Sequence, residues 1–219
     1  MTALAAAVAA VVAGCAGGTT VEGTPTSTAT SQLDSLLNNE QARVEPTTEQ
    51  TVPPVVPSNV TLDDLVAWTA DESQKFWEDQ GVPTFFTVQA QDIGDLKCDE
   101  YVFGTSDAVY CNRDNVIKWL PANLNKMAKK GGKLTAVFTI AHEVGHSVQD
   151  SLEIFNGNKL REEGADCFAA AFMAHAGVNV EDINVAIRAT PTMQSLDRIE
   201  AAQAGYESNN PLVTCMAYQ

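Results

Sequence analysis

Residues 135–150 read TAVFTIAHEVGHSVQD, a mostly apolar run that contains two histidines. The length and apolar content of this run predict a buried helix. His142 and His146 are two of only three histidines in the 219-residue chain. Because positions i and i+4 share one face of a helix, both imidazoles can reach one metal ion. The stretch therefore predicts an interior helix that supplies two ligands of a metal site.

Glu143 lies between these histidines and is rotated by about 100° from His142 on a helix. There it flanks the metal without binding it, which is where a general base for a metal-bound water belongs. Buried His and Glu side chains are costly unless a partner satisfies them, and a metal is such a partner. Gly145 costs the helix about 1 kcal/mol relative to alanine. Its presence favours the close approach of another backbone at that point.

Zinc needs a third protein ligand and leaves its fourth position to water. The segment 160–166, LREEGAD, supplies the candidates. Glu162 and Asp166 are four residues apart, so they share a helix face. Glu162 can bind the metal, and Asp166 can accept the N–H of a ligating histidine. Glu163 remains the alternative ligand, because it also lies near Asp166.

The composition limits the classes of partner. The net charge is −15 and the apolar fraction is 45%, which is typical of a folded protein with an acidic, solvated surface. Nucleic acid is excluded as a partner, because phosphates are bound by basic surfaces. Electrostatic docking on anionic lipid is disfavoured for the same reason.

The N-terminal residues indicate export. Residues 1–14 are uncharged and rich in Ala and Val, which is typical of the apolar core of a signal peptide. Val12–Cys15 reads VAGC and resembles the lipobox of bacterial lipoproteins, in which Cys15 would carry the lipid. No Lys or Arg precedes Arg43, so we expect the true translation start to lie upstream. The only contact with a membrane would then be the lipid anchor, on the extracytoplasmic side of a bacterium.

Residues 15–60 are rich in Thr, Ser, Pro and Gln. Such a segment cannot bury enough surface to offset chain entropy, so we expect a disordered, lipid-anchored tether. The folded domain is expected at 61–219. Four cysteines remain in it, and in an exported domain an even number predicts two disulfides with three possible connectivities. We expect the pair that brackets a short Gly/Ser/Asp-rich segment to bond, which leaves the other two: Cys98 with Cys111, and Cys167 with Cys215.

The domain is predicted to be α+β, with a small antiparallel sheet packed on the active-site helix and several helices after it. Strands are expected over 83–90 and in a hairpin over 108–119. Helices are expected over 61–80, with Thr61 as N-cap, and over 121–130, 134–150, 159–176, 180–189 and 195–207. His175 lies nine residues beyond Asp166, on the opposite helix face, and is expected to be structural or exposed.

AHEVGHSVQ, followed on the next helix by EEGADCFAA, resembles the bacterial neutral zinc metallopeptidases, a family of zincins whose third ligand is a glutamate. Weaker matches are QKFWEDQG, the segment between Cys98 and Cys111, and SLDRIEAAQAGYESNNPLVTC. The resemblance covers nearly all of 61–219. It implies a zincin-like fold, one Zn²⁺ held by His142, His146 and Glu162, and Glu143 as general base.

One departure concerns the last of these stretches. Members of the family often carry a histidine shortly before its S-x-x-R motif, but 191–198 reads PTMQSLDR. If that histidine stabilises the oxyanion in relatives, another group must do so here. The candidates are Tyr206, Tyr110 and Arg198.

These features predict hydrolysis of a peptide or protein substrate by a metal-activated water, with the peptide extended along the edge of the 108–119 hairpin. The alternative is a catalytically silent zincin that binds a peptide or an envelope partner. A hydrolase of cell-wall material would use the same zinc chemistry on another substrate.

Overall fold

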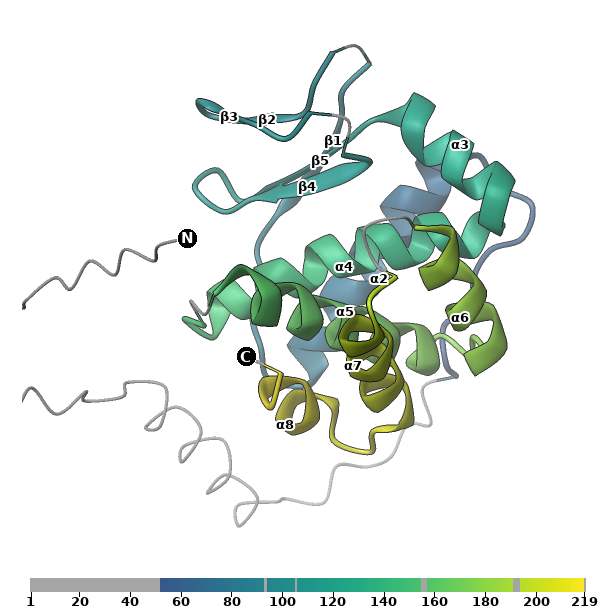
Figure 1. Ribbon diagram of the computed structural model, residues 1–219. Coiled ribbons are helices and arrows are strands. Elements are labelled where there is room, and N and C mark those ends of the chain that lie inside the picture. The colour runs from purple at the N-terminus through teal and green to yellow at the C-terminus, as the bar shows by residue number, and fades with distance from the viewer. Residues whose placement is uncertain (1–51, 93, 105, 155–156, 191–193, 219) are drawn as a thin grey trace, which may run out of the picture.

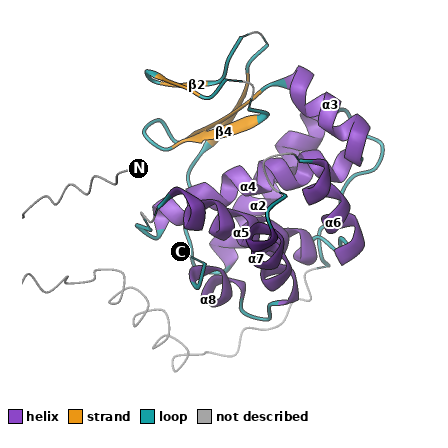
Figure 2. Cartoon of the chain, in the orientation of Figure 1, coloured by secondary structure: helices purple, strands orange, loops and turns teal. Residues whose placement is uncertain are grey.

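The computed structural model describes residues 52–218 except 93, 105, 155–156 and 191–193 (Figure 1). The signal peptide predicted for 1–14, the Cys15 predicted to carry a lipid and most of the predicted tether lie outside the described residues. Helices make up most of the described part and the strands gather at one side of it (Figure 2), so the α+β class is confirmed. Among the described helices, none combines the length and the apolarity that crossing a bilayer requires.

The predicted helices are present with small shifts at their ends, and a short C-terminal helix is added that the sequence did not suggest. Their bounds are α2 (Leu62–Asp79), α3 (Pro121–Gly131), α4 (Lys133–Ser151), α5 (Asn158–His175), α6 (Val180–Ala189), α7 (Leu196–Glu207) and α8 (Pro211–Met216).

Local chemistry sets several of these ends. Thr61 is the N-cap of α2, since its hydroxyl accepts the amide N–H of Asp64 at 3.1 Å, as a first-turn donor requires. Gly132 separates α3 from α4 with φ of 84°, a conformation that favours glycine. Upstream of Thr61, Val60 already packs against the core, and its carbonyl accepts the Lys133 ammonium at 2.8 Å.

The main sheet is mixed, so the prediction of an antiparallel sheet was wrong. Its order is β1 (Thr87–Ala90), β5 (Val116–Trp119) and β4 (Ala108–Cys111). The β4–β5 hairpin is antiparallel as predicted, but β1 pairs with β5 in parallel. Between β1 and β5 the chain forms β2 (Lys97–Cys98), β3 (Tyr101–Val102) and then β4, and this long connection returns β5 in the direction of β1.

Helices α4 and α5 form the centre of the molecule. Every residue from Thr135 to Gln149 is buried, as is every residue from Glu163 to Met173. A helix that is buried on every face must pack against other elements on every face. The sheet covers α4 through β4, α2 lies against it, and α7 and α8 pack against α5 (Figure 1).

Both expected disulfides are formed, Cys98–Cys111 and Cys167–Cys215. The first ties the β2–β3 hairpin to the edge strand β4. The second ties the short helix α8 to the central helix α5. The two bonds therefore attach two short elements, the β2–β3 hairpin and α8, to the rest of the fold.

Candidate metal centre

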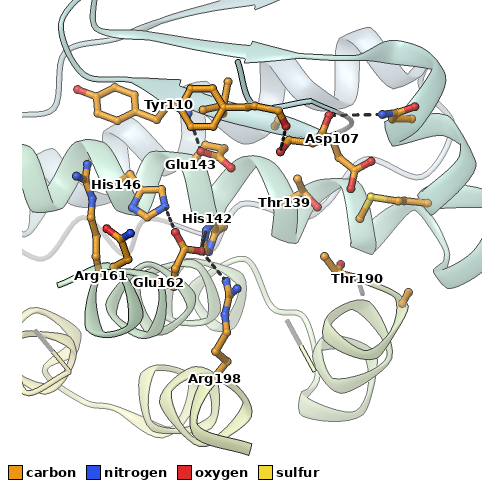
Figure 3. A pocket seen from close by; sticks show the side chains of 18 of the residues that line it. Asp107, Tyr110, Thr139, His142, Glu143, His146, Arg161, Glu162, Thr190 and Arg198 are labelled. Atoms are coloured by element: carbon orange, nitrogen blue, oxygen red, sulfur yellow. Dashed lines mark hydrogen bonds and ion pairs between the residues drawn. The ribbon is translucent and has the colours of Figure 1, made fainter. Parts of the chain in front are cut away.

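His142, His146 and Glu162 converge on one point between α4 and α5 (Figure 3). Glu162 Oε2 lies 3.3 Å from His142 Nε2, and Glu162 Oε1 lies 3.4 Å from His146 Nε2. Ligands about 2.0–2.1 Å from a tetrahedral ion are separated by about 3.3–3.4 Å. The three side chains can therefore hold one metal ion with little rearrangement.

Both imidazoles are oriented by acceptors at their other nitrogen. His142 Nδ1 lies 2.8 Å from Asp166 Oδ1, and His146 Nδ1 lies 2.8 Å from Gln149 Oε1. The Gln149 amide is itself oriented, because its Nε2 donates to the Arg161 carbonyl at 2.7 Å. Acceptors at both Nδ1 atoms hold a proton there, so Nε2 is the nitrogen of each ring that faces Glu162 and can either bind a metal ion or carry a second proton.

If both Nε2 atoms carried only lone pairs, they and the negative carboxylate of Glu162 would repel one another unless a positive charge lay between them. Burial alone would lower the pKa of His142, but the charge and hydrogen bond of Asp166, with Glu162, raise it to about 10. Burial alone would raise the pKa of Glu162, but the hydrogen bonds and charges of His142 and His146 hold it well below its usual range. The site thus stabilises positive charge at its centre, which protons or a metal ion can supply.

Of the two candidate glutamates, Glu162 is the one that faces the histidines. Glu163 is buried on the neighbouring face of α5, and its nearest cation is the Lys159 ammonium at 3.6 Å. His175, predicted to lie away from the site, is exposed and stacks on Phe76 with 4.7 Å between ring centroids.

Arg198, on α7, links the two carboxylates of α5. Its Nη2 lies 3.0 Å from Asp166 Oδ1 and 3.2 Å from Glu162 Oε2, and its Nε also donates to Asp166. Only about a tenth of its side chain is exposed. Asp166 is therefore held by an arginine on one side and by His142 on the other, which fixes the orientation of both.

Glu143 extends from α4 toward the sheet, about 100° around the helix from His142. Its Oε2 accepts the Tyr110 amide N–H at 2.7 Å, and the residue is 7% exposed. This hydrogen bond connects α4 to the edge strand β4. It fixes one carboxylate oxygen beside the metal ligands.

These groups line a cleft of about 1100 Å³ between β4 and the helices α3, α5, α6 and α7. In Figure 3, Tyr110 and Glu143 lie on the sheet side, while Glu162 and Arg198 lie on the side of the helices. Tyr110 and Arg198, both named as oxyanion candidates, line this cleft. Tyr206 packs against the hydrophobic core and is not among the lining residues.

Sequence reasoning missed the contacts of Gln149 and Arg198, as well as the hydrogen bond from the Tyr110 amide to Glu143. Gln149 lies three residues after His146 on the same helix, so helical spacing could have revealed it. Arg198 contacts Asp166 across 32 residues of sequence, and no local spacing indicates such a pair.

In comparisons with known proteins, no family model, no curated protein and no solved structure matches the chain. The resemblance to neutral zinc metallopeptidases therefore rests on the motifs and on the residues that they bring together.

Proposed function

We propose that this protein is a zinc-dependent peptidase with a zincin-like site, in which Glu143 is the general base. The observation that carries the proposal is the convergence of His142, His146 and Glu162 on one point beside Glu143. Two imidazole nitrogens and one carboxylate, with an open cleft on the fourth side, are the donor set of catalytic zinc. Zinc bound there would supply Lewis acidity toward a water molecule and a substrate carbonyl.

Glu143 moves the proton. The Tyr110 amide holds its Oε2 at 2.7 Å, so proton transfer falls to Oε1. This oxygen removes a proton from the attacking water and later gives it to the leaving amine. A module that only binds peptides has no evident use for a carboxylate held in this position, which favours the enzyme over the silent binder.

The free edge of β4 is suited to an extended peptide. Strand β4 is at the edge of its sheet. The Leu120 amide donates to the Asp107 carbonyl at 2.9 Å. Because hydrogen-bonded pairs alternate in an antiparallel ladder, the main-chain groups of Ala108 and Tyr110 point away from β5. The Tyr110 N–H binds Glu143, and the groups of Ala108 would pair with the peptide.

Arg198 is the best placed of the three oxyanion candidates. Its guanidinium lines the cleft and reaches within 3.2 Å of Glu162 Oε2. Its fixed positive charge lies beside the point where a scissile carbonyl would develop negative charge. The Tyr110 hydroxyl donates instead to Asn115 at 2.9 Å.

The proposed location is outside the cytoplasmic membrane, on a lipid anchor at Cys15. Two disulfides support it, because such bonds persist in oxidising compartments. The mass of the mature N-terminus tests it: a diacylglyceryl adduct on Cys15 is expected, and an unmodified thiol would reject the anchor.

The decisive test combines metal analysis of the purified full chain with a cleavage assay on a mixture of blocked peptides. We expect one zinc per chain and cleavage that Glu143→Gln lowers by about 10²- to 10⁴-fold while zinc is retained. His146→Ala serves as the control that loses zinc as well. One zinc without cleavage of any peptide would favour the silent binder, and a chain that takes up no metal would contradict the proposal.

A further inference from the structure

One end of the cleft is lined by lysines. Figure 3 shows Asp107, Thr139 and Thr190 at this end and Arg161 at the other, with the metal ligands between them. Helix α3 forms the wall near Asp107, and its Lys126 and Lys130 both line the cleft. They are four residues apart, so their side chains extend from one face of α3.

A contact with a facing element holds the Lys130 ammonium at this end of the cleft. The Lys130 Nζ donates to the Ala189 carbonyl at 3.4 Å, at the end of α6. Lys126 interacts electrostatically with Asp107, the residue that precedes β4. Among the described residues that line this end, Asp107 is the one acidic residue. The two lysines and the one aspartate give this end of the cleft a net positive charge. The chain as a whole has a net charge of −15.

We infer that this end of the cleft binds a carboxylate carried by the residue that follows the scissile bond, so that the preferred substrates are peptides with Asp or Glu at that position. The inference rests on the proposed peptidase function. Lys130 would pair with the carboxylate, and Lys126 would share its charge between that carboxylate and Asp107. Buried Thr139 and Thr190 also line the cleft, and their hydroxyls donate to the Thr135 and Ala186 carbonyls.

The direction of the peptide decides which residue reaches the lysines. Strand β4 runs from the Asp107 end of the cleft toward the Tyr110 end. A peptide that pairs antiparallel with β4 therefore enters at the Arg161 end and leaves at the Asp107 end. Its residues after the scissile bond lie against α3.

The test is cleavage of a mixture of acetylated, amidated peptides by the zinc-loaded full chain, with the cut bonds identified by mass spectrometry. We expect Asp and Glu after the cut to be favoured over Asn and Gln by about two- to fivefold in kcat/KM, as a partly exposed ion pair allows. In the double variant Lys126→Glu/Lys130→Glu, Lys and Arg should be favoured at that position instead.

Lys129→Glu is the matched control, because Lys129 lies on the same helix, is exposed and is not among the lining residues. It should keep the acidic preference. A second set of peptides, with a free C-terminal carboxylate directly after the cut position, separates the two possible sources of the carboxylate. Preference for blocked peptides with an internal Glu would show that the pocket binds a side-chain carboxylate. Cleavage that requires a free C-terminus would overturn the side-chain assignment.

A binding measurement separates failure of this inference from failure of the proposed function. Fluorescein-labelled blocked peptides that differ only by Glu or Gln are titrated into Glu143→Gln protein and followed by anisotropy. Tighter binding of the Glu peptide, lost in the double lysine variant but not with Lys129→Glu, supports the carboxylate site even if no peptide is cut. Zinc-dependent cleavage without acidic preference overturns the inference and leaves the peptidase standing, and equal binding of the two peptides overturns it as well.

Discussion

At the scale of single residues, the candidate site is a set of buried polar groups that satisfy one another. Asp166 accepts from both His142 and Arg198, and Gln149 accepts from His146 while donating to a main-chain carbonyl. Such a network is stable only when every member has a partner. The two Nε2 atoms and Glu162 stabilise a positive charge between them, which either a proton or a metal ion can supply.

This charge leads to a prediction about zinc binding. Without metal, the His142 pKa of about 10 means a protonated imidazole at neutral pH, whereas a zinc ligand must be deprotonated. Zinc uptake should therefore release about one proton from His142, and zinc affinity should rise by up to about tenfold per pH unit as pH increases toward 10. Calorimetric titration with zinc at pH 8, in buffers of different ionisation enthalpy, measures the released protons.

Asp166→Asn is the control for this proton release. It removes the carboxylate that does most to raise the pKa of His142, so fewer protons should be released at the same pH. Zinc affinity should also fall by about 10- to 100-fold, because the ligand loses its orienting partner. A binding heat that does not depend on the buffer in the unsubstituted protein would contradict the prediction.

The residues that could be read from the sequence are those whose relations are local. His142, Glu143 and His146 follow from spacing on one helix, whereas spacing to Asp166 favours Glu162 but leaves Glu163 open as the third ligand. The Tyr110 amide that holds Glu143 comes from a strand 33 residues upstream. Its role depends on how the sheet docks on α4, which no local pattern encodes.

At the scale of elements, the position of Glu162 depends on how closely α5 approaches α4. Glycine at 145 allows the approach: a Cβ there would lie 2.8 Å from the Ala165 carbonyl oxygen and 3.0 Å from Ala165 Cα. These are backbone atoms, so the contact is relieved only by moving one helix. The sequence predicted a close backbone at this position, and the structure identifies it as α5, the helix that carries Glu162.

Gly145→Ala should therefore damage the fold and the site together. Overpacking should destabilise the protein by about 1–3 kcal/mol, although alanine favours an isolated helix by about 1 kcal/mol. Separation of α4 and α5 should also weaken zinc binding, because Glu162 lies three residues before Ala165. Urea unfolding and zinc competition with a chelator measure the two effects.

Gly157→Ala is the matched control for this prediction. A Cβ at Gly157, the N-cap of α5, would meet nothing within 4 Å, so we expect a change below about 1 kcal/mol and unchanged zinc affinity. If Gly145→Ala were as mild as Gly157→Ala, the close contact would not be what positions Glu162.

Element types were predictable to a greater extent than their pairing. The helix pattern located α4 to within a residue at each end, because its apolar run is long and is bounded by glycines and a polar end. The parallel pairing of β1 with β5 was not predictable, since it depends on where the chain returns after the β2–β3 hairpin. Helix α8 was missed because six residues are too few for a periodic signal.

At the scale of the whole molecule, two disulfides stabilise parts of the fold that are far from each other. Cys167–Cys215 closes 48 residues and Cys98–Cys111 closes 13. Chain entropy alone gives about 4 kcal/mol for the longer loop and about 3 kcal/mol for the shorter. Their consequences for the cleft differ, because Cys111 belongs to β4, the proposed substrate strand, whereas Cys215 lies on α8.

The double variant Cys167→Ala/Cys215→Ala should lose about 2–4 kcal/mol of unfolding free energy and free the C-terminal segment, since a six-residue helix does not persist unsupported. Zinc binding should survive, because α4, α5 and α7 supply the ligands and their partners without α8. The double variant Cys98→Ala/Cys111→Ala should lose about 2–3 kcal/mol and should weaken peptide binding as well, since it removes the covalent link between the β2–β3 hairpin and β4. Urea unfolding, zinc stoichiometry and peptide anisotropy on both variants separate the two roles. Loss of zinc on removal of Cys167–Cys215 alone would show that α8 supports the metal centre. That result would contradict the view that Cys167–Cys215 only stabilises the fold, whereas Cys98–Cys111 also supports peptide binding.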